Sequence, residues 1–464
     1  MPHRRPSSLW LALLLALGAA CNRQGTAAPR NLLLVSIDSL RADHVGCYGY
    51  ARPTSPTLDR LAAEGVRFAQ AQSPTSWTLP AHVSMLSGRS QESHHVLTSF
   101  DAIQPDEELL AQVFSRAGYE TIGFYSGPHL HPVFGFNRGF DAYVSCESEE
   151  TAKLHGPPAW ESSHGDRTNP LIKERFGEWL ARRSESQRAF FAFVHMWDVH
   201  FDYIPPEPYA SMFDPDYKGP LDGRDIIDKG FPLDAPARDV DHLRALYDGE
   251  IRYTDDTLGE LLAMLDRAHL LDETLVVVVA DHGEEFLEHG GKTHQRTIFQ
   301  EVVHVPLILW ARAGLPRGRA IAELVSLEDV APTVLELLGL PALARADGQS
   351  LVKLIRGDAM EHAPVFSSLY FDFANELAFA SVRREQSEII YSGENDAWEQ
   401  YDLGADPGEK APRPVADEGM RSLLTAQVER AKSMLTARAG AGKRHRAALP
   451  PDVTERLKKL GYLR

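Results

Sequence analysis

The stretch Thr274–Ala280, TLVVVVA, has the clearest strand pattern in this sequence of 464 residues, and Asp281-His282-Gly283 follows it directly. An unbroken apolar run of this length is typical of a strand that is covered on both faces, as in a parallel sheet. Near the other end of the chain, Asn31–Asp38, NLLLVSID, shows the same pattern and also ends in an acid. Ligands bind at the carboxyl ends of strands in open α/β sheets, so both acids are candidates for a functional site.

Strand and helix patterns alternate from residue 30 to 355, which predicts an α/β fold with a doubly wound, mostly parallel sheet flanked by helices. Further strands are expected at 66–69, 121–125, 190–195 and 305–310, and helices at 57–64, 107–117, 171–183, 241–265 and 327–338. After residue 360, short strands are expected at 365–370, 377–382 and 388–391, then helices at about 418–437 and 453–463. We therefore expect a catalytic domain at 30–358 and a smaller C-terminal α+β subdomain at 359–464.

Residues 1–20 have the pattern of an export signal. They begin with a basic His-Arg-Arg run, continue with an apolar run too short for an ordinary membrane span, and end in Gly-Ala-Ala before Cys21. Small residues ending in a cysteine resemble a bacterial lipoprotein signal, which predicts a cell-envelope protein that is lipid-anchored through Cys21. A periplasmic or secreted soluble protein is the alternative. Residues 21–29 are predicted to be a short tether.

The charge and the cysteines exclude some classes of function. The formal net charge is −17 at pH 7, which argues against nucleic-acid binding. An anionic substrate is still compatible with this charge, because a bound metal ion can dominate the local field. The three cysteines, Cys21, Cys47 and Cys146, form no CxxC pair and have no zinc-knuckle spacing. Cys47 and Cys146 can pair only if the fold brings them together.

The segment Ser73–Arg89, SPTSWTLPAHVSMLSGR, predicts a turn followed by a helix, with Thr78 at the junction. Pro80 suits the first helical turn, where its missing N–H is not needed. Free backbone N–H groups and the positive end of the helix dipole favour an anion at such a junction. Thr78 is therefore either a helix N-cap or a nucleophile that attacks phosphorus or sulfur.

Two predicted strands end in Asp38 and in Asp281-His282, and a sheet brings strand ends together. With the Thr78 hydroxyl, these groups would form a set of ligands for a divalent metal ion, which would activate the hydroxyl and polarise a bound phosphoryl or sulfuryl oxygen. Carboxylate and hydroxyl oxygens suit Mg²⁺, Ca²⁺ or Mn²⁺, whereas an imidazole ligand favours Mn²⁺ or Zn²⁺.

Two other polar clusters follow the same logic. His195-Met-Trp-Asp198-Val-His200 comes just past a predicted strand and could supply a general acid or ligands for a second metal. In 284–294, EEFLEHGGKTH, Lys292 could neutralise a substrate oxyanion. Each cluster taken alone is more often a set of solvated loop residues, but several of them at successive strand ends favour a functional site.

The motifs resemble the sulfatase family of the alkaline phosphatase superfamily. The resemblance runs through most of residues 30–463 and includes NLLLVSIDSLRADHVGCYGY, TSWTLPAHVSMLSGR, FVHMWDVHFDYIPP, VVADHGEEFLEHG and VSLEDVAPTVLELLGLP. It implies an alkaline-phosphatase-like fold and a divalent metal, with Mn, Zn, Ca or Mg as the choices. Carried over by position, it implies metal ligands, a nucleophile, a leaving-group acid and groups that bind the non-bridging oxygens: Asp38, Thr78, Asp281 and His282 for the metal, Thr78 as nucleophile, His200 as acid, and Lys292, His82 and His294 for the oxygens.

This sequence departs from the family pattern at the nucleophile. Sulfatases carry Cys or Ser in C/S-x-P-x-R and oxidise it to formylglycine, whereas here the motif is Thr78-Leu-Pro-Ala-His82. Threonine cannot give that aldehyde. Ser39 replaces a second aspartate, the GKWH-type sulfate grip is absent around 123–126, and the pair at 281–282 is Asp-His instead of Asp-Asn. These features resemble phosphodiesterases, phosphoethanolamine transferases and lipoteichoic-acid synthases of the same superfamily.

We therefore predict a metal-dependent, exported hydrolase of sulfate or phosphate esters, in which Thr78 favours phosphoester, phosphodiester or phosphonate chemistry. The substrate would be a small-molecule, glycan or lipid ester, and the only membrane contact would be the lipid anchor. Loops at 150–170 and 204–240 are expected to shape the pocket. Two alternatives stay open: transfer of the phosphoryl group to an alcohol, and a catalytically inactive metal-binding surface lipoprotein.

Overall fold

A computed structural model describes residues 29–147, 168–183, 186–361, 363–371, 376–440 and 445–463. The predicted export signal, Cys21 and most of the predicted 150–170 loop lie outside these residues. Within the described residues, no helix is both long and apolar enough to cross a membrane. The two cysteines that the structure describes, Cys47 and Cys146, form no disulfide with each other.

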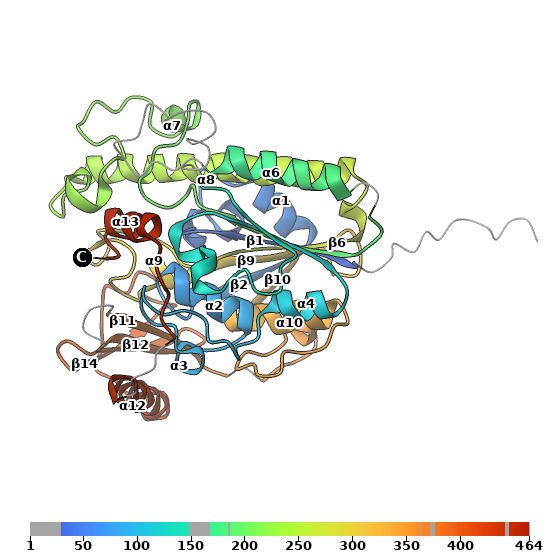
Figure 1. Ribbon diagram of the computed structural model, residues 1–464. Helices are drawn as coiled ribbons and strands as arrows, with labels where there is room; N and C mark the ends of the chain where they lie inside the picture. The colour runs from blue at the N-terminus through green and yellow to red at the C-terminus, as the bar shows by residue number, and fades with distance from the viewer. Residues whose placement is uncertain are drawn as a thin grey trace, which may run out of the picture.

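A central sheet of eight strands organises the larger part of the described chain, in the order β10-β2-β9-β6-β1-β5-β3-β4 (Figure 1). Its middle strands are parallel and completely buried: β6 (Thr274–Ala280), β1 (Asn31–Ile37) and β5 (Phe190–Met196). The outer strands are β3 (Glu120–Tyr125), β4 (Ala142–Ser145), β9 (His304–Trp310), β2 (Val66–Gln72) and β10 (Arg319–Ser326). Only β9 runs antiparallel to its neighbours in this sheet, so the prediction of a mostly parallel sheet is confirmed.

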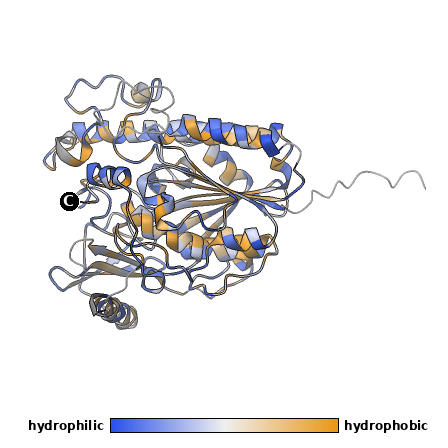
Figure 2. Ribbon diagram, viewed as in Figure 1, coloured by the Kyte–Doolittle hydropathy of each residue, from blue (hydrophilic) through white to orange (hydrophobic). Residues whose placement is uncertain are grey.

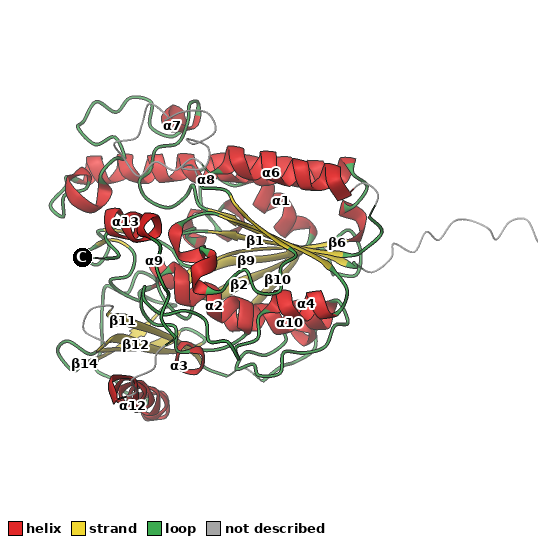
Figure 3. Cartoon of the chain, in the orientation of Figure 1, coloured by secondary structure: helices red, strands yellow, loops and turns green. Residues whose placement is uncertain are grey.

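Helices cover both faces of the sheet, as the doubly wound pattern predicts (Figure 3). One face carries α1 (Pro56–Glu64), α6 (Asn169–Arg182) and α8 (Ala237–Arg267), and the other carries α2 (Thr78–Ser87), α4 (Leu110–Arg116) and α10 (Val330–Leu337). Apolar colour is concentrated on the strands and on the helix faces that meet them (Figure 2). The core therefore lies in two layers, one on each side of the sheet.

Shorter elements connect these layers. The short helices are α3 (Gln91–His94), α7 (Tyr209–Met212), α9 (Gln300–Val303) and α11 (Val352–Arg356), and β7 (Glu285–Phe286) pairs with β8 (Lys292–Thr293). Single turns of 3-10 or π helix lie at Ala42–His44, Gly46–Tyr48, Pro128–Leu130 (η3), Pro132–Phe134, Ile226–Gly230 (η6), Leu271–Glu273 and Leu327–Asp329.

The C-terminal part forms a second, antiparallel sheet. Its strands are β11 (Val365–Phe371), β12 (Glu376–Arg384), β13 (Ser387–Ser392) and β14 (Ala397–Asp402), in that order. Helix α12 (Glu418–Gly440) packs on this sheet around a separate apolar cluster that includes Val382 and Leu424. The last helix, α13 (Pro451–Lys459), instead contacts η3, and its Val453 and Leu457 join the main core.

The structure differs from the sequence-based expectations at a helix boundary and at several strands. The helix expected at 107–117 begins at Leu110, because Leu109 is extended and its N–H is bonded by the side chain of Gln112 at 2.9 Å. Strands β4, β10 and β14 and the short β7–β8 hairpin were not expected. β4, β10 and β14 contain exposed or partly buried residues, so they lack the continuous apolar pattern of the central strands.

Candidate active site

The polar residues at the ends of the central strands meet at one edge of the sheet. Asp38 follows β1, and Asp281 and His282 follow β6, because Ile37 pairs with Ala280 in the parallel register. Parallel strands place their carboxyl ends on the same edge, which is why residues more than 240 positions apart in sequence become neighbours. All three side chains are completely buried.

Helix α2 carries Thr78 into this cluster. The helix begins at Thr78, and the N-cap position belongs to Trp77, so the threonine side chain does not cap the helix. Its Oγ1 instead lies 3.4 Å from Oδ2 of Asp38 and 3.3 Å from Nε2 of His282. The hydroxyl is therefore held between a carboxylate and an imidazole, next to the free N–H groups of a helix N-terminus.

Ser39 links the two carboxylates of the cluster. Its hydroxyl donates to Oδ1 of Asp38 at 2.7 Å, and its backbone N–H donates to Oδ1 of Asp281 at 3.2 Å. Ser39 adopts a left-handed backbone conformation, with φ of 57°. The serine that replaces the family's second aspartate thus contributes hydrogen-bond donors where the family pattern has another carboxylate.

Burial and charge push the pKa values of the two carboxylates apart. Burial would raise the pKa of Asp38, but the hydrogen bond with His195 and the charges of His200 and His282 hold that pKa well below its usual value. Burial and the negative charge of Asp38 raise the pKa of Asp281 well above its usual value. Two close, buried carboxylates of this kind ionise together only when a cation neutralises them.

The donor set fits a divalent cation. Asp38, Asp281 and His282 offer ligand atoms that all lie within 4.8 Å of one another. Oδ2 of Asp281 is buried and has no hydrogen-bond donor among the described residues. The Nδ1–H of His282 donates to the carbonyl oxygen of Gly283 at 2.9 Å, and burial lowers the pKa of this histidine to about 4. A neutral ring with Nδ1 protonated leaves Nε2 free to bind a metal.

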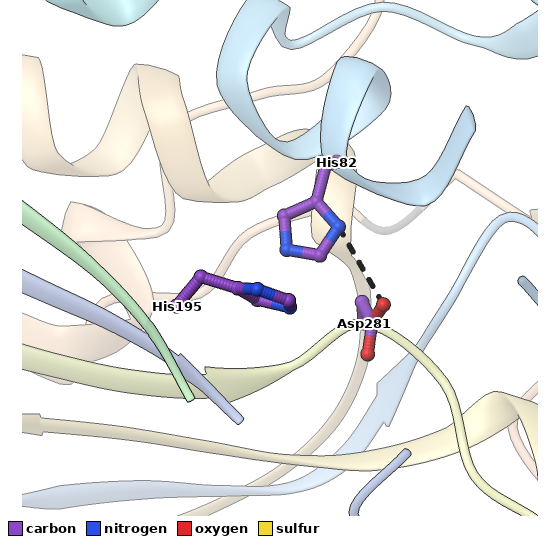
Figure 4. Close-up of side chains that lie close together, drawn as sticks. All are labelled: His82, His195 and Asp281. Carbon is purple, nitrogen blue, oxygen red and sulfur yellow. Dashed lines mark ion pairs between the residues drawn. The ribbon is translucent and has the colours of Figure 1, made fainter. Parts of the chain in front are cut away.

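His82 and His195 pack beside Asp281 and point toward one another and toward its carboxylate (Figure 4). His82 Nδ1 lies 3.5 Å from Oδ2 of Asp281, and it donates to the carbonyl oxygen of Thr78 at 2.8 Å. Its Nε2 lies 2.9 Å from the hydroxyl of Ser36, and burial lowers its pKa to about 3. Both ring nitrogens thus have partners within the protein, and the substrate-binding role expected for His82 remains a prediction.

Lys292 also makes contacts that differ from its expected role. It lies on β8, and its Nζ donates to the carbonyl oxygens of Ile226 at 2.6 Å and Phe231 at 2.9 Å. These two residues belong to the 204–240 segment that was predicted to shape the pocket. Lys292 therefore fixes this segment to the β7–β8 hairpin, and its predicted role as an oxyanion binder remains a prediction.

His200 and His294 lie together next to the metal-ligand candidates. Their ring centroids are 4.9 Å apart, and the ring of His294 is 4.4 Å from that of His282. Nδ1 of His294 lies 3.0 Å from Oε1 of Glu284. The structure therefore brings these two sequence-predicted residues into the same buried cluster as Thr78, while their catalytic roles remain predictions.

His195, which belongs to the polar cluster expected just past a strand, bonds Oδ2 of Asp38 through Nε2 at 3.1 Å. Two other buried side chains of the site were not identified from the sequence. His129 on η3 contacts Trp77 and has a buried Nδ1 without a partner in the described chain. Tyr462 comes from the C-terminal end, and no local pattern marks it. Asp198, by contrast, accepts hydrogen bonds from the first residues at the start of α6, which is a structural role.

Comparisons with known proteins agree with this architecture. A family model described as sulfatase matches residues 30–340, and one described as the C-terminal part of N-sulphoglucosamine sulphohydrolase matches residues 288–434. An N-acetylglucosamine-6-O-sulfatase of Bacteroides thetaiotaomicron is 22% identical over 87% of this chain and 86% of that enzyme. Human iduronate 2-sulfatase is 24% identical over 78% of this chain and 82% of its own length.

Solved structures give the same result for the fold. The phosphonate monoester hydrolase of Agrobacterium radiobacter superposes with a TM-score of 0.70 and 22% identity, covering 88% of this chain and 96% of that one. A 2-O glycosaminoglycan sulfatase superposes with a TM-score of 0.69 and 20% identity, covering 89% of this chain and 94% of that one. Both sulfur and phosphorus ester hydrolases thus share this fold.

Proposed function

The chain belongs to the sulfatase family of sulfuric and phosphoric ester hydrolases, and we propose that it is a threonine-dependent member that acts on phosphorus esters. The observation that carries this proposal is the position of the Thr78 hydroxyl. It lies within 3.4 Å of both Asp38 and His282, at the start of a helix and at the ends of the central strands. That position suits a nucleophile that holds negative charge during attack.

The proposed reaction has two steps. The Thr78 hydroxyl releases its proton to water and its Oγ1 attacks the phosphorus atom; the bond from phosphorus to the leaving oxygen breaks, and that oxygen takes a proton from protonated His200. A second water molecule then gives one proton back to His200 and attacks the same phosphorus atom, and the bond to Oγ1 breaks. Oγ1 takes up a proton from water, and the product acid is released. A divalent ion held by Asp38, Asp281 and His282 would supply Lewis-acid stabilisation of the phosphoryl oxygens.

The residues of the chain orient the nucleophile before any attack. Asp38 and His282 offer acceptors to the Thr78 hydroxyl, and His82 holds the backbone of the same residue by bonding its carbonyl oxygen. The surrounding side chains are buried, which excludes bulk water from the nucleophile and strengthens local electrostatic interactions.

The preference for phosphorus over sulfur rests on the residue at position 78. Threonine cannot form the formylglycine that sulfatase chemistry uses, so a direct ester of its hydroxyl is the available intermediate. Among the structures of similar fold, the hydrolase from Agrobacterium radiobacter acts on phosphonate monoesters. We therefore infer that an aryl phosphonate monoester or phosphate diester is a better substrate than an aryl sulfate.

The test compares four ester classes on one purified protein. The protein is loaded in turn with Mn²⁺, Zn²⁺, Ca²⁺ or Mg²⁺, and rates are measured on 4-nitrophenyl sulfate, phosphate, phenylphosphonate and a phosphate diester. Thr78→Ala is expected to lower the best rate at least about 1000-fold, whereas Thr78→Ser keeps a hydroxyl and loses much less activity. Equal melting temperatures of the variants would show that the fold is intact.

The outcomes separate the parts of the proposal. An unchanged rate in Thr78→Ala would remove this residue as nucleophile, and a clear preference for the sulfate would overturn the phosphorus assignment. Mass spectrometry of the acid-quenched reaction should find a phosphorus ester on Thr78. A phosphoryl group found on added glycerol would instead identify a phosphoryl transferase. Metal binding without turnover of any ester would identify a catalytically inactive metal-binding surface lipoprotein.

We also propose that the protein is exported and lipid-anchored through Cys21, on the pattern of its first residues. Cells that express the full chain are labelled with palmitate, and the membrane and soluble fractions are compared. Label on the wild-type chain that is lost in Cys21→Ala would support the anchor. A wild-type protein without label, found in the periplasm or medium, would show a soluble exported protein instead.

A further inference from the structure

A tyrosine side chain from the C-terminal part reaches the candidate active site. Helix α13 ends at Lys459, and Gly461 then adopts a left-handed conformation with φ of 76°. The N–H groups of Tyr462 and Leu463 both bond the carbonyl oxygen of Leu457, at 2.8 and 3.2 Å. This turn after the helix directs Tyr462 inward, and only 4% of the residue is exposed.

The Tyr462 hydroxyl lies between two histidines of the site. It is 2.9 Å from Nε2 of His200 and 2.7 Å from Nε2 of His294. Burial and nearby negative charges, that of Asp38 first among them, raise the pKa of Tyr462 well above its usual value, so the phenol keeps its proton. The phenol oxygen is therefore a neutral hydroxyl in the space next to the candidate metal ligands.

This position is the one that a leaving oxygen has to take in the proposed reaction. A general acid works only when the leaving oxygen lies within hydrogen-bond reach of it, and Tyr462 already places an oxygen at that distance from Nε2 of His200. Nδ1 of His200 lies 2.6 Å from the carbonyl oxygen of Phe201, which can only accept, so in a neutral ring Nε2 accepts from the tyrosine. With Tyr462 in place, Nε2 of His200 therefore has neither a proton to give nor room for a leaving oxygen.

The ring of Tyr462 has the surroundings that an aromatic leaving group would need. Its centroid lies 4.3 Å from that of His129 and 6.0 Å from that of His294. The ring of His129 in turn lies 5.4 Å from that of Trp77, the residue before Thr78. Aromatic rings attract one another at such separations. The site thus holds a phenol close to the nucleophile, with two imidazoles at its oxygen and aromatic side chains around its ring.

We propose that Tyr462 is an internal occupant of the leaving-group subsite, which the phenolic leaving group of a substrate displaces. This inference rests on the proposed function and deepens it, because it names phosphorus esters of phenols as the substrate class. Displacement needs no movement of α13, whose Val453 and Leu457 are buried in the main core. Gly461 is exposed and has no side chain, so the backbone can rotate there and carry Tyr462 and Leu463 out of the core together.

The sign of the activity change tests this role. Tyr462→Ala removes the occupant, so that a substrate no longer has to displace it. We expect KM for 4-nitrophenyl phenylphosphonate to fall about 10-fold with kcat little changed, because the form that can bind substrate is no longer a minor state. A tyrosine that is a permanent part of the site predicts the opposite. A kcat/KM that falls or stays the same in Tyr462→Ala would overturn the inference.

Added phenol gives a second test, because it can refill the space that Tyr462→Ala leaves. In the leaving-group subsite, phenol competes with the substrate and inhibits the variant, and it has at least about 10-fold less effect on wild type, where the subsite is occupied. Rescue of the variant by phenol would overturn the inference. Cyclohexanol has a hydroxyl but no aromatic ring, so it should inhibit less than phenol, and equal inhibition would contradict the phenolic substrate class.

Tyr462→Phe keeps the ring and removes only its two hydrogen bonds, so it also serves as the test if Tyr462→Ala is unstable. It should lower KM about 3-fold, and a KM that does not fall would overturn the inference. Tyr401→Phe is the matched control, because its hydroxyl donates to Oε2 of Glu399 at 2.7 Å in the C-terminal sheet. It should change neither kcat nor KM. Melting temperatures of all variants check that the fold is kept.

A binding measurement separates this inference from the proposed function. In protein with ¹⁵N-labelled histidine, Tyr462→Ala should shift the ring signals of His200 and His294, and added phenol should shift them back toward their wild-type positions. Signals that do not respond to phenol would overturn the inference even in an inactive protein. Failure of the proposed function would show itself differently, as a wild-type rate that survives in Thr78→Ala.

Discussion

The molecule contains two buried clusters of charged residues, and they differ in their source of positive charge. The first is the group around Thr78, with Asp38 and Asp281, whose ligand atoms face one another without a permanent cation. The second joins the central sheet to the C-terminal sheet, where Arg383 lies near the carboxylates of Glu388 and Glu409. Both clusters are almost completely buried.

The second cluster contains its own positive charge, although Oε1 of Glu388 and Oε1 of Glu409 have no hydrogen-bond partner among the described residues. Nη1 of Arg383 donates to Oε1 of Gln300 at 2.7 Å, and its Nη2 bonds Gln70 on β2. Gln300 donates from its side chain to Glu388 at 2.8 Å and from its backbone to Glu409 at 2.7 Å. A guanidinium is charged at every accessible pH, so this cluster contains a permanent cation.

The first cluster carries carboxylates, imidazoles and hydroxyls. Burial lowers the pKa values of both His282 and His294 to about 4, so these two rings are neutral at pH 7. We therefore propose that one charge cluster contains its own cation, whereas the other is completed by a bound cation. Four experiments, in order of expected effect, test this difference.

Asp281→Asn should have the largest effect, about a 1000-fold loss of kcat/KM, because it removes a charged metal ligand. The free energy of unfolding of the metal-free protein should not fall. With its pKa raised in the folded state, Asp281 keeps a proton at pH values where the unfolded chain has lost it, so stability falls as pH rises above the usual carboxyl range. Asparagine removes this dependence and keeps an acceptor for the N–H groups of Ser39 and His282.

The measurement is denaturant unfolding of wild type and Asp281→Asn at pH 5 and pH 8 in the presence of EDTA, together with the activity of the metal-loaded forms. The variant should be as stable as wild type at pH 8 or more stable. A large loss of stability without metal would mean that the first cluster is structural like the second.

Arg383→Met should show the opposite behaviour. Removal of this guanidinium leaves Glu388 and Glu409 without their neighbouring positive charge, which should lower the free energy of unfolding by about 3 kcal/mol. The activity of the folded fraction should stay near that of wild type. Chemical denaturation and rate measurements check both points, with Arg383→Lys as the control that keeps the charge. A loss of kcat larger than the loss of folded protein would contradict the separation of the two clusters.

Metal binding should stabilise only the first cluster. Saturation with metal at 100 times Kd is expected to raise the free energy of unfolding by about 2.7 kcal/mol. Wild type and Arg383→Met should both gain this amount, whereas Asp281→Asn should gain much less. Thermal unfolding over a metal titration measures the gain, and an equal gain in Asp281→Asn would place the metal elsewhere.

The smallest expected effect is at His289, which contacts Glu409 of the second cluster. His289 pairs with Glu301 at 2.6 Å and bonds the carbonyl oxygen of Glu409 at 3.1 Å. Although burial opposes the charged form, Glu301 raises the pKa of His289 above its usual value. The stabilisation is therefore fully present below the unfolded-state pKa of 6.5 and is lost as pH rises through the raised folded-state pKa.

His289→Ala should accordingly cost about 1 kcal/mol at pH 6 and less at pH 9. Unfolding curves at the two pH values give the difference, and His445→Ala, at an exposed position, serves as the control. A cost that is equal at both pH values would show that packing on Phe299, and not the ion pair, is what His289 contributes.

The continuous apolar strands were readable from sequence because burial on both faces leaves an unbroken pattern, as in Thr274–Ala280. The acids that follow them were readable for the same reason, since each stands at the abrupt end of such a run. The C-terminal helix at 453–463 was also expected, but the pattern of α13 carries no information about which surface it packs on. Strands with partial burial, such as Arg319–Ser326, were missed because their pattern is irregular.

The sequence alone predicted the fully buried strands, most of the longer helices, the polar residues at the strand ends, and the threonine where a formylglycine precursor would stand. The packed structure was needed to show which of these side chains meet. It turned His82 toward the backbone of Thr78, directed Lys292 to the 204–240 segment, and placed Tyr462 against a histidine 262 positions earlier. The physical reason is that local periodicity encodes burial, whereas a hydrogen bond between distant residues depends on how packed elements are oriented.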